Sequence, residues 1–447
     1  VKVYRFPSFA CGKNRHRSTT LRSLLLAAPT ADIGVFRFPS FACGKNRLRS
    51  TTLRSLLLAA PTADIYMADR YNVPPSFNLT EIELSMSNLT EQHVRDLLGS
   101  ILDPYAAADI AGLGWIRAVG IDGNRVSVDL RAGYPLGDRQ AEFAAEIAGA
   151  LESDDLVEKA VVNLGWKVVP HVVQGELKPQ EQIKNIIAVA SGKGGVGKSA
   201  TSVNLALALA ADGARVGVLD ADIYGPSMPR MLGVSGPPDT DGNRIVPLRA
   251  HGLQVMSIGF MVEEDTPMIW RGPMVTSALQ QLLGETNWEG LDYLVIDLPP
   301  GTGDIQLTLS QNIPVSGCVI VTTPQDIALL DARKAVQMFR KVEMSVLGVV
   351  ENMSTHVCSQ CGHAEPIFGT GGGSRMAEQY DLPLLGQLPL ALQIREDLDN
   401  GRPTVVSDPD SDLSASYREV ARSVAARLSA TPRNLALNLP QINIHNS

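Results

Sequence analysis

Residues 186–210, IIAVASGKGGVGKSATSVNLALALA, restrict the possible folds more than any other stretch of the chain. An apolar, strand-like run leads into a glycine-rich loop, and a helix-like run follows at once. Glycines allow the loop backbone to adopt unusual dihedral angles and to approach a ligand closely. The loop amides and the N-terminus of the helix would then point at one place, which suits an anion. The stretch therefore predicts a strand, a phosphate-binding loop and a helix, as in a P-loop.

The loop contains each part that a P-loop uses to hold a nucleotide. Lys198 is expected to contact the β- and γ-phosphates, and the Ser199 hydroxyl is expected to bind Mg²⁺. A glycine-rich turn without a ligand is the alternative, and the flanking strand and helix argue against it. The predicted nucleotide-binding residues of the loop are Gly192, Lys193, Gly194, Gly195, Val196, Gly197, Lys198 and Ser199.

From about residue 185 the sequence alternates between apolar strands and helices. Helix-like segments such as TSVNLALALAADG separate continuous apolar runs, and this pattern predicts a doubly wound α/β fold with a mostly parallel sheet covered on both faces. Ligands of such sheets bind at the carboxyl ends of the strands. The runs expected to be strands are IIAVAS, RVGVLDAD, LQVMSIGF, LDYLVIDLPP, CVIVTTP, VLGVVENM and PLLGQLP.

Polar residues stand where three of these strands are expected to end. Asp297 closes the run YLVID, and a buried carboxylate there is costly unless it is paired or bound to a metal ion. Asp222 follows VGVLDA, with Asp220 as its structural neighbour, and Asn352 follows VVE. A lone asparagine at a strand end is otherwise usually part of a turn or a cap. These positions are expected near the P-loop, because strand ends meet at one edge of a parallel sheet.

Cys358 and Cys361 form a CxxC pair with His356 and His363 beside it. Two thiolates are half of a four-coordinate metal site. The histidines could complete a zinc site, but four ligands from eight consecutive residues would strain a tetrahedron, and zinc sites usually use two separated pairs. A thioredoxin-type redox pair normally opens a helix, whereas the nearby glycine and proline indicate a loop. Two inert surface cysteines are the third interpretation.

Residues 87–172 predict a small α/β domain. The run NLTEQHVRDLLGSIL places apolar residues on one helical face, and WIRAVGIDGNRVSVDLRAGYP predicts a hairpin turning at Asp122–Asn124. RQAEFAAEIAGALES predicts a second helix and LVEKAVVNLGWKVVP a last strand. Residues 173–184 are expected to link this domain to the P-loop domain, which we place at residues 185–430, with a tail at residues 431–447.

The first 66 residues differ from the rest of the chain in pattern and charge. The segment 5–33 recurs at 37–65 with a single difference, His16 against Leu48. It resembles a recent duplication, translated upstream DNA or an organellar transit peptide. We therefore expect the working protein to begin near Met86, after a linker at residues 67–86, and we do not pair Cys11 or Cys43 with the CxxC.

Charge and hydropathy exclude some kinds of partner. Residues 1–66 hold 11 basic and 2 acidic residues, and the remainder holds 28 basic and 45 acidic ones. The acidic body makes nucleic acid an improbable partner. No run of 18 apolar residues occurs, so no transmembrane helix is expected. The few scattered cysteines suit a reducing cytoplasm.

The loop GKGGVGKS resembles the deviant Walker A motif of the MinD/ParA/nitrogenase-reductase class of P-loop ATPases. The resemblance implies an ATP-dependent homodimer in which Lys193 reaches the partner's nucleotide. It also implies that Asp222 positions the attacking water, that Asp297 holds Mg²⁺ through water and that Asn352 contacts the adenine. Members of the class often carry Thr where Ala200 stands, so one hydroxyl contact to the α-phosphate is expected to be missing.

The motifs KGGVGKS, LDADIYGPS, WRGPM, IDLPPGTGD and ENMS followed by CxxCG occur in this order. With the small domain they resemble the Mrp/ApbC iron–sulfur cluster carrier proteins over residues 88–430. The resemblance implies that Cys358 and Cys361 of two protomers hold one [4Fe–4S] cluster, since four thiolates are its ordinary complement. It further implies a carrier that receives a cluster from an assembly scaffold and passes it to apo iron–sulfur proteins in a cycle coupled to ATP hydrolysis. Lys193, Lys198, Asp222 and Asp297 are then the catalytic residues.

Two other functions fit parts of the sequence. One is a MinD/ParA-like positioning ATPase with a membrane or DNA partner, although the apolar stripe of the last helix, residues 413–428, is more typical of core packing than of a membrane anchor. The other is a zinc-binding regulator that senses ATP. The small domain contains no cysteine, so a docking or regulatory role is expected for it.

Overall fold

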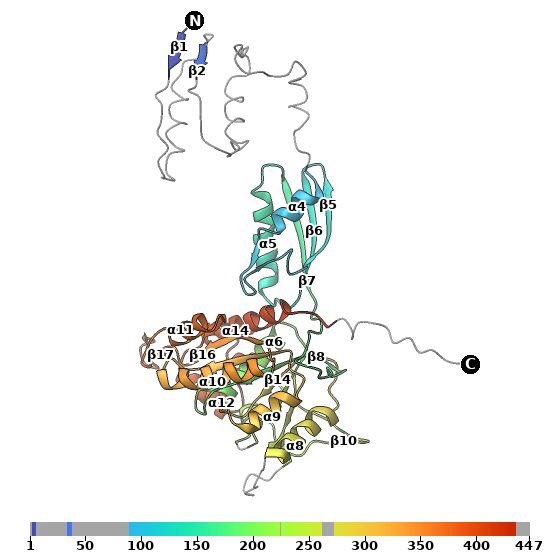
Figure 1. The fold of residues 1–447 in the computed structure, drawn as a ribbon, viewed down its shortest axis with the longest axis vertical. Helices are drawn as coiled ribbons and strands as arrows, with labels where there is room; N and C mark the ends of the chain where they lie inside the picture. Colours follow the sequence, from blue (N-terminus) through green and yellow to red (C-terminus); the bar gives the residue numbers. More distant parts are fainter. Residues whose placement is uncertain (1, 6–33, 38–88, 224, 262–271, 435–447) are drawn as a thin grey trace, which may run out of the picture. The chain divides into compact units, whose positions relative to one another are not determined.

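The computed structural model describes residues 2–5, 34–37, 89–223, 225–261 and 272–434 (Figure 1). The chain forms two compact units, Val1–Met86 and Ser87–Ser447. In the first unit, β1 (Lys2–Arg5) and β2 (Gly34–Arg37) pair in parallel. The remainder of the tandem repeat, the expected start near Met86 and the tail beyond residue 434 lie outside the described residues, so those predictions stay untested.

The small domain has the elements that the sequence predicts. Its three-stranded sheet has the order β5-β6-β7, with β5 and β6 antiparallel and β6 and β7 parallel. The predicted hairpin turns at Gly123 and Asn124, between Asp122 and its partner Arg125. The elements are α4 (Glu91–Leu98), β3 (Leu102–Asp103), β4 (Ala108–Asp109), β5 (Ile116–Asp122), β6 (Arg125–Ala132), α5 (Arg139–Glu152) and β7 (Lys159–Trp166).

One face of this sheet is buried under the helices because apolar residues alternate along β6. Val126, Val128 and Leu130 point into the core, and the polar residues between them, Ser127 and Asp129, are exposed. The helix α5 buries Phe143 at the same core, where the ring packs edge-on against Trp115. The sheet and its two helices therefore share one hydrophobic core.

The large domain is built on an eight-stranded sheet with the order β12-β13-β9-β14-β8-β15-β16-β19. All seven predicted runs form strands of it, and they pair in parallel, so the predicted fold class is confirmed. The strands are β8 (Ile183–Ala190), β9 (Val216–Asp220), β12 (Leu248–Ala250), β13 (Leu253–Ser257), β14 (Leu291–Asp297), β15 (Gly317–Thr322), β16 (Val346–Glu351) and β19 (Leu384–Gln387).

The edge strand β12 is antiparallel and was not predicted. It joins β13 through a tight turn at His251 and Gly252, both in the left-handed region. Two-stranded ribbons lie outside the sheet at β10 (Thr240–Asp241) with β11 (Arg244–Ile245) and at β17 (His356–Val357) with β18 (Ala364–Glu365).

Helices cover both faces of the sheet. The helix α6 packs on β8, β9 and β14, and α14 packs on α6 and β19, whereas α10 packs on β15 and α9 (Figure 1). The helices are α6 (Lys198–Ala211), α7 (Met228–Met231), α8 (Gly272–Glu285), α9 (Asp304–Asn312), α10 (Asp326–Lys341), α11 (Gly372–Gln379), α12 (Leu392–Asp399), α13 (Thr404–Ser407) and α14 (Asp412–Ser429), with a 3₁₀ turn at Ile258–Phe260.

The apolar stripe of α14 is part of the core. Tyr417, Val420, Val424 and Leu428 are all buried against neighbouring elements. The prediction that this stripe serves packing is therefore confirmed. In the described part of the chain, no helix combines the length and hydropathy needed to cross a membrane.

Candidate functional site

The predicted P-loop connects the end of β8 to the start of α6. Gly195 and Gly197 have φ angles of 83° and 80°, a region that side chains other than glycine rarely enter. Gly192 lies so close to the backbone of α10 at Asp331 that a Cβ atom there would collide with it. These glycines are therefore required by the path of the loop.

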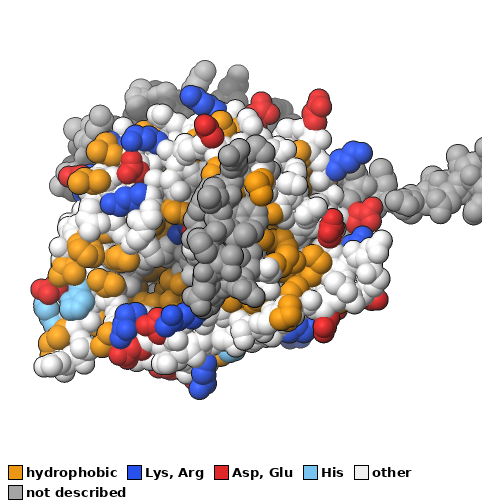
Figure 2. Space-filling view, turned by 90° about the horizontal axis from the view of Figure 1, so that it is seen from below, with side chains coloured by type: hydrophobic (Ala, Val, Ile, Leu, Met, Phe, Trp, Pro, Cys, Tyr) orange, Lys and Arg blue, Asp and Glu red, His pale blue; other side chains and the backbone are white. Residues whose placement is uncertain are grey.

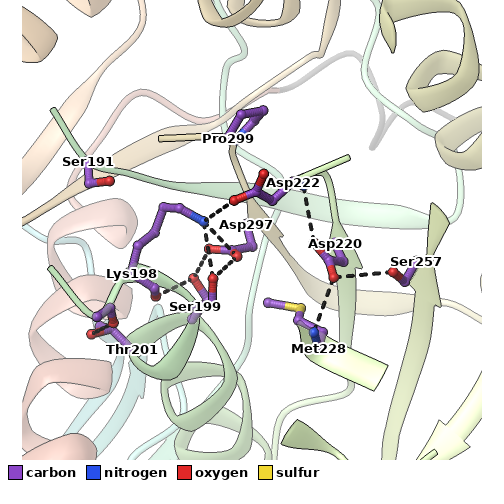
Figure 3. A network of polar contacts seen from close by, with 12 residues as sticks. Ser191, Lys198, Ser199, Thr201, Asp220, Asp222, Met228, Ser257, Asp297 and Pro299 are labelled. Carbon is purple, nitrogen blue, oxygen red and sulfur yellow. Dashed lines mark hydrogen bonds and ion pairs between the residues drawn. The ribbon is translucent and has the colours of Figure 1, made fainter. Parts of the chain in front are cut away.

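Asp297, at the carboxyl end of β14, is the centre of the site (Figure 3). Its side chain is fully buried, and one oxygen accepts a charged contact from Lys198 Nζ at 2.7 Å and a hydrogen bond from Ser199 Oγ. The other oxygen accepts a hydrogen bond from Ser202 Oγ at 2.7 Å. The carboxylate is thus paired, which offsets the free-energy cost of burying a charged group at a strand end. The Ser199 hydroxyl and the Asp297 carboxylate also form an oxygen-donor set that fits Mg²⁺.

Ser202 is a contributor that sequence reasoning missed. It lies three residues after Ser199, so both hydroxyls project from one face of α6 toward the same carboxylate. The P-loop motif ends at Ser199, but the helical spacing of three residues is enough to predict that Ser202 faces the same carboxylate.

Asp220 orders the segment that carries Asp222. It pairs with Asp297 across the β9–β14 ladder and is fully buried. One oxygen accepts the Asp222 amide at 3.1 Å, and the other accepts the Met228 amide and the Ser257 hydroxyl, each at 3.2 Å (Figure 3). Burial and, second, the charge of Asp297 raise the pKa of Asp220 to about 7. Asp220 therefore fixes the backbone of the segment that follows β9 at Asp222 and at Met228.

Asp222 itself lies at the edge of the site. Its carboxylate is 3.8 Å from Lys198 Nζ, and the side chain is largely covered. The structure thus brings the two lysine-facing carboxylates, Asp222 and Asp297, to the place that the sequence predicts. The assignment of water positioning to Asp222 stays a prediction.

Lys193 occupies a different position from Lys198. Its side chain is partly exposed, and it makes no ion pair with any carboxylate of the described residues. Its backbone carbonyl accepts a hydrogen bond from Ser191 Oγ at 2.9 Å, which fixes the start of the loop. Lys193 thus combines an anchored backbone with a partly exposed side chain, which is compatible with a contact to another molecule.

Asn352 lies against the P-loop from the side of β16. Its side-chain amide donates to the Val196 carbonyl at 2.9 Å, and its backbone amide donates to the Thr322 carbonyl at 2.8 Å. The structure thus places Asn352 beside the loop, and the predicted adenine contact stays untested.

The cysteine pair lies in the turn of a hairpin. The strands β17 and β18 flank it, the Cys358 amide donates to the His363 carbonyl at 2.9 Å, and the Gly362 amide donates to the Cys358 carbonyl at 2.9 Å. No helix starts at the pair, so the predicted loop is confirmed. The amides of Gln360 and Cys361, and then the Cys361 thiol, lower the pKa of Cys358 by hydrogen bonding. A stabilised thiolate is the form that binds metal.

The hairpin gives two accessible sulfur ligands and no complete site. Cys361 is exposed and Cys358 partly so, whereas Cys318 is buried in β15. His356 Nδ1 lies 3.8 Å from a Glu365 oxygen. Over the described ranges, no cluster of three or more His, Cys, Asp or Glu side chains could hold a metal ion. Figure 2 shows histidine side chains at the left edge of the large domain, the side on which Figure 1 shows β17.

A lysine and a serine at the start of the helix that follows the loop meet an aspartate at the end of the neighbouring strand. This arrangement defines a P-loop NTPase with a doubly wound sheet. Residues 182–425 match a protein-family model described as NUBPL iron-transfer P-loop NTPase, which covers more than half of the chain. The chain therefore belongs to the family of iron-transfer P-loop NTPases. Residues 91–163 match a second model, described as iron–sulfur cluster assembly protein.

Curated relatives agree with this assignment. The iron–sulfur cluster carrier protein of Haemophilus influenzae is 50% identical over 349 residues, which are 76% of this chain and 94% of the relative. That of Salmonella typhimurium is 65% identical over 248 residues, 55% of this chain and 67% of the relative. The iron–sulfur cluster transfer protein NUBPL of Mus musculus is 54% identical over 258 residues, 57% of this chain and 81% of the relative. The predicted family resemblance is thus confirmed.

Proposed function

We propose that this protein is an ATP-hydrolysing carrier that binds a [4Fe–4S] cluster between two copies of the chain and transfers it to apo iron–sulfur proteins. The observation that carries the proposal is that one domain brings the P-loop lysine and serine to the aspartate Asp297 and also carries two accessible thiols on a hairpin. Family membership supports iron transfer as the purpose of that combination.

In this proposal the buried network around Asp297 turns over ATP. Lys198 would exchange its contact with Asp297 for the β- and γ-phosphates, and Ser199 and Asp297 would hold a Mg²⁺ ion that neutralises phosphate charge. Asp222, on the segment ordered by Asp220, positions the attacking water. Loop amides and charges do most of the work, because phosphoryl transfer needs positioning more than covalent help.

A homodimer would complete both sites. Lys193 stands on an anchored loop and its side chain is partly exposed, which would allow a contact in trans. Next to the loop, α10 exposes Ile327 and Leu330, which are 69% and 54% accessible in the single chain. Large exposed apolar side chains favour burial in an interface. Two copies related by a two-fold axis also bring Cys358 and Cys361 to four thiolates, the usual complement of the cluster.

The cluster is cargo in this scheme, so the site that holds it must open. A hairpin of two-residue strands at the surface is suited to receiving a cluster from an assembly scaffold and releasing it to a recipient. We assign the small domain to docking or regulation, since residues 91–163 match the assembly-protein model and hold no cysteine. A reducing cytoplasm would keep the thiols available.

Anaerobic reconstitution with iron and sulfide tests the proposal. The expected product is a brown dimer with about four iron and four sulfide per two chains. Iron and sulfide assays measure the stoichiometry, and light scattering measures the mass. Zinc bound at one ion per monomer, with no sulfide, would show instead that the hairpin is a zinc site.

A further inference from the structure

The residue after β16 connects the two sites of the large domain. Asn352 is only 7% exposed, and its amide nitrogen donates to the carbonyl of Val196 in the P-loop. Six residues further along the chain stands Cys358. A single buried side chain thus touches the nucleotide loop directly and belongs to the segment that carries the thiols.

The contact between Asn352 and the loop is close. A Cβ atom on Gly197 would collide with the amide nitrogen of Asn352, and it would lie 3.7 Å from Cε of Met353. Gly197 and Met353 both have left-handed backbones, with φ of 80° and 55°. For Met353 this conformation costs roughly 1–2 kcal/mol, so its surroundings must hold it in place. A displacement of the loop at Gly197 would therefore press on both Asn352 and Met353.

The segment from Asn352 to Cys358 has little slack. The Ser354 amide donates to the Leu388 carbonyl at 3.0 Å, and the Leu390 amide donates to the Thr355 carbonyl at 2.7 Å. The Val357 amide then donates to the Leu390 carbonyl at 3.0 Å. These bonds hold the chain as a short ladder that runs from the end of β16 to the first cysteine. Movement at Asn352 would reach the hairpin instead of being absorbed by a loose loop.

The chain that leaves the hairpin is tied to the neighbouring residue. Glu351 is buried, and its carboxylate accepts hydrogen bonds from the Gly373 amide at the start of α11 and from the Gln387 side chain. Both arms of the hairpin segment are therefore fixed to the dipeptide Glu351–Asn352. Glu351 gives the fixed point, and Asn352 gives the contact to the P-loop.

We propose that Asn352 is a positioning residue that transmits occupancy of the P-loop to the cysteine hairpin. A nucleotide held by the loop amides changes the backbone positions of Val196 and Gly197. The side-chain amide of Asn352 then moves with the Val196 carbonyl, to which it donates a hydrogen bond. The ladder after Asn352 then changes how the two thiols are presented. The inference rests on the proposed function in one respect only, the binding of a nucleotide at the P-loop, and it requires no bound cluster.

A ligand shifts a conformation only through contacts that differ between the two states. Here those contacts are the hydrogen bond from Asn352 to Val196 and the packing of Met353 at Gly197. A contact of Asn352 with adenine alone would predict something different. In that case, replacing the Asn352 side chain would weaken nucleotide binding. At saturating nucleotide, the change in thiol reactivity on nucleotide binding would then be the same as in the parent.

The experiment measures the alkylation rate of Cys358 and Cys361 by iodoacetamide in the full-length apo protein. Cys11 and Cys43 are replaced by serine throughout, and Cys318 is buried, so the signal comes from the hairpin. Rates are compared without nucleotide, with Mg-ADP and with a non-hydrolysable Mg-ATP analogue. Equilibrium dialysis verifies that each variant is saturated. Peptide mass spectrometry assigns the modified residue.

The variants are Asn352→Ala and the isosteric Asn352→Asp, which keeps the volume and removes the donor. The matched control is Asn185→Ala. Asn185 is also buried and also donates to a backbone carbonyl, that of Val169 at 2.9 Å, but it stands near the start of β8, away from the P-loop and the hairpin. The control reports the effect of losing a buried asparagine as such.

We expect nucleotide to change the alkylation rate of the parent and of Asn185→Ala by about fivefold, near the lower end of typical coupling between sites. Both Asn352 variants should respond by less than about twofold. A full response in saturated Asn352→Asp would overturn the inference. An unresponsive parent with bound nucleotide would also overturn it, and would leave the cluster-carrier proposal standing. A parent that binds no nucleotide would overturn both.

Discussion

The nucleotide end and the cysteine end of the large domain are built in opposite ways. At the nucleotide end, Lys198 is 5% exposed and Asp297 is fully buried, and hydroxyls of α6 donate to both oxygens of that carboxylate. At the cysteine end, two thiols stand on a surface turn between strands of two residues each. The first site thus brings its lysine, serine and aspartate together within one chain, whereas the described residues around the second offer two thiols and no third metal ligand.

Under the proposed function, the difference between the two ends follows from what each site handles. A reacting phosphate gains most from charges and dipoles that are fixed before it binds, because they need not reorganise during the reaction. Cargo must leave again, so a rigid, buried cage would hinder its release. An exposed hairpin with strands of only two residues each belongs to the less stable part of a fold, even where the chain leading to it is held by hydrogen bonds. In the proposed dimer, dividing the ligands between two copies would make opening of the dimer a route to release.

The largest expected effect is on the cysteine end. Cys358→Ala should reduce reconstituted iron from about four per dimer to background, because only two of the four thiolates per pair of chains remain. Nucleotide affinity should not change, since the thiol makes no contact with the loop. Iron assay and equilibrium dialysis measure the two quantities. Cys318→Ala, which alters a buried cysteine of β15, is the control. Half-loaded Cys358→Ala dimers would contradict a shared site.

The next effect concerns the nucleotide end. Lys198→Ala should lower ATP turnover by about a hundredfold or more, the loss typical when a fixed donor to developing charge is removed. Reconstituted iron should stay the same as in the parent. Lys184→Ala, which removes a lysine paired with Asp292 at 2.6 Å in the same domain, is the matched control. Unchanged turnover in the Lys198 variant would remove this lysine from the mechanism.

The sequence predicts the two ends unequally well. The P-loop can be predicted because its strand, glycines and helix are adjacent in the chain. The seven long strands can be predicted because each is a continuous apolar run. The edge strand β12 is not apparent from the sequence because it has three residues, of which Leu248 and Ala250 are partly buried and Arg249 is exposed. The pairing of Asn352 with Val196 could not be read from the sequence, since it joins residues 156 positions apart and depends on β16 lying two strands from β8.

A third prediction concerns the support beneath the nucleotide end. The pKa of Asp220 is raised to about 7, so between about pH 4 and pH 7 the folded state holds a proton that the unfolded chain releases. The free energy of unfolding should therefore fall as pH rises through this window, by about 1.4 kcal/mol per pH unit. Asp220→Asn cannot titrate and should lack this contribution.

Urea unfolding at pH 5.0 and pH 6.5 measures the effect of Asp220. The difference between the free energies of unfolding of the parent and of Asp220→Asn should change by about 2 kcal/mol over this interval. Groups outside the site titrate in both proteins and cancel in the difference. Equal pH dependence in the two proteins would show that Asp220 is ionised throughout, and that its bonds to Asp222, Met228 and Ser257 outweigh its burial.

The smallest expected effect returns to the cysteine end. His363→Ala and His356→Ala should each leave the iron and sulfide content of the reconstituted dimer unchanged, within the error of the assay. His363 is exposed beside the turn, and His356 faces Glu365, so neither side chain is held toward the sulfurs. Loss of metal in either variant, with zinc as the bound ion, would make the hairpin a complete site within one chain. The contrast between a complete nucleotide site and a shared cysteine site would then no longer hold.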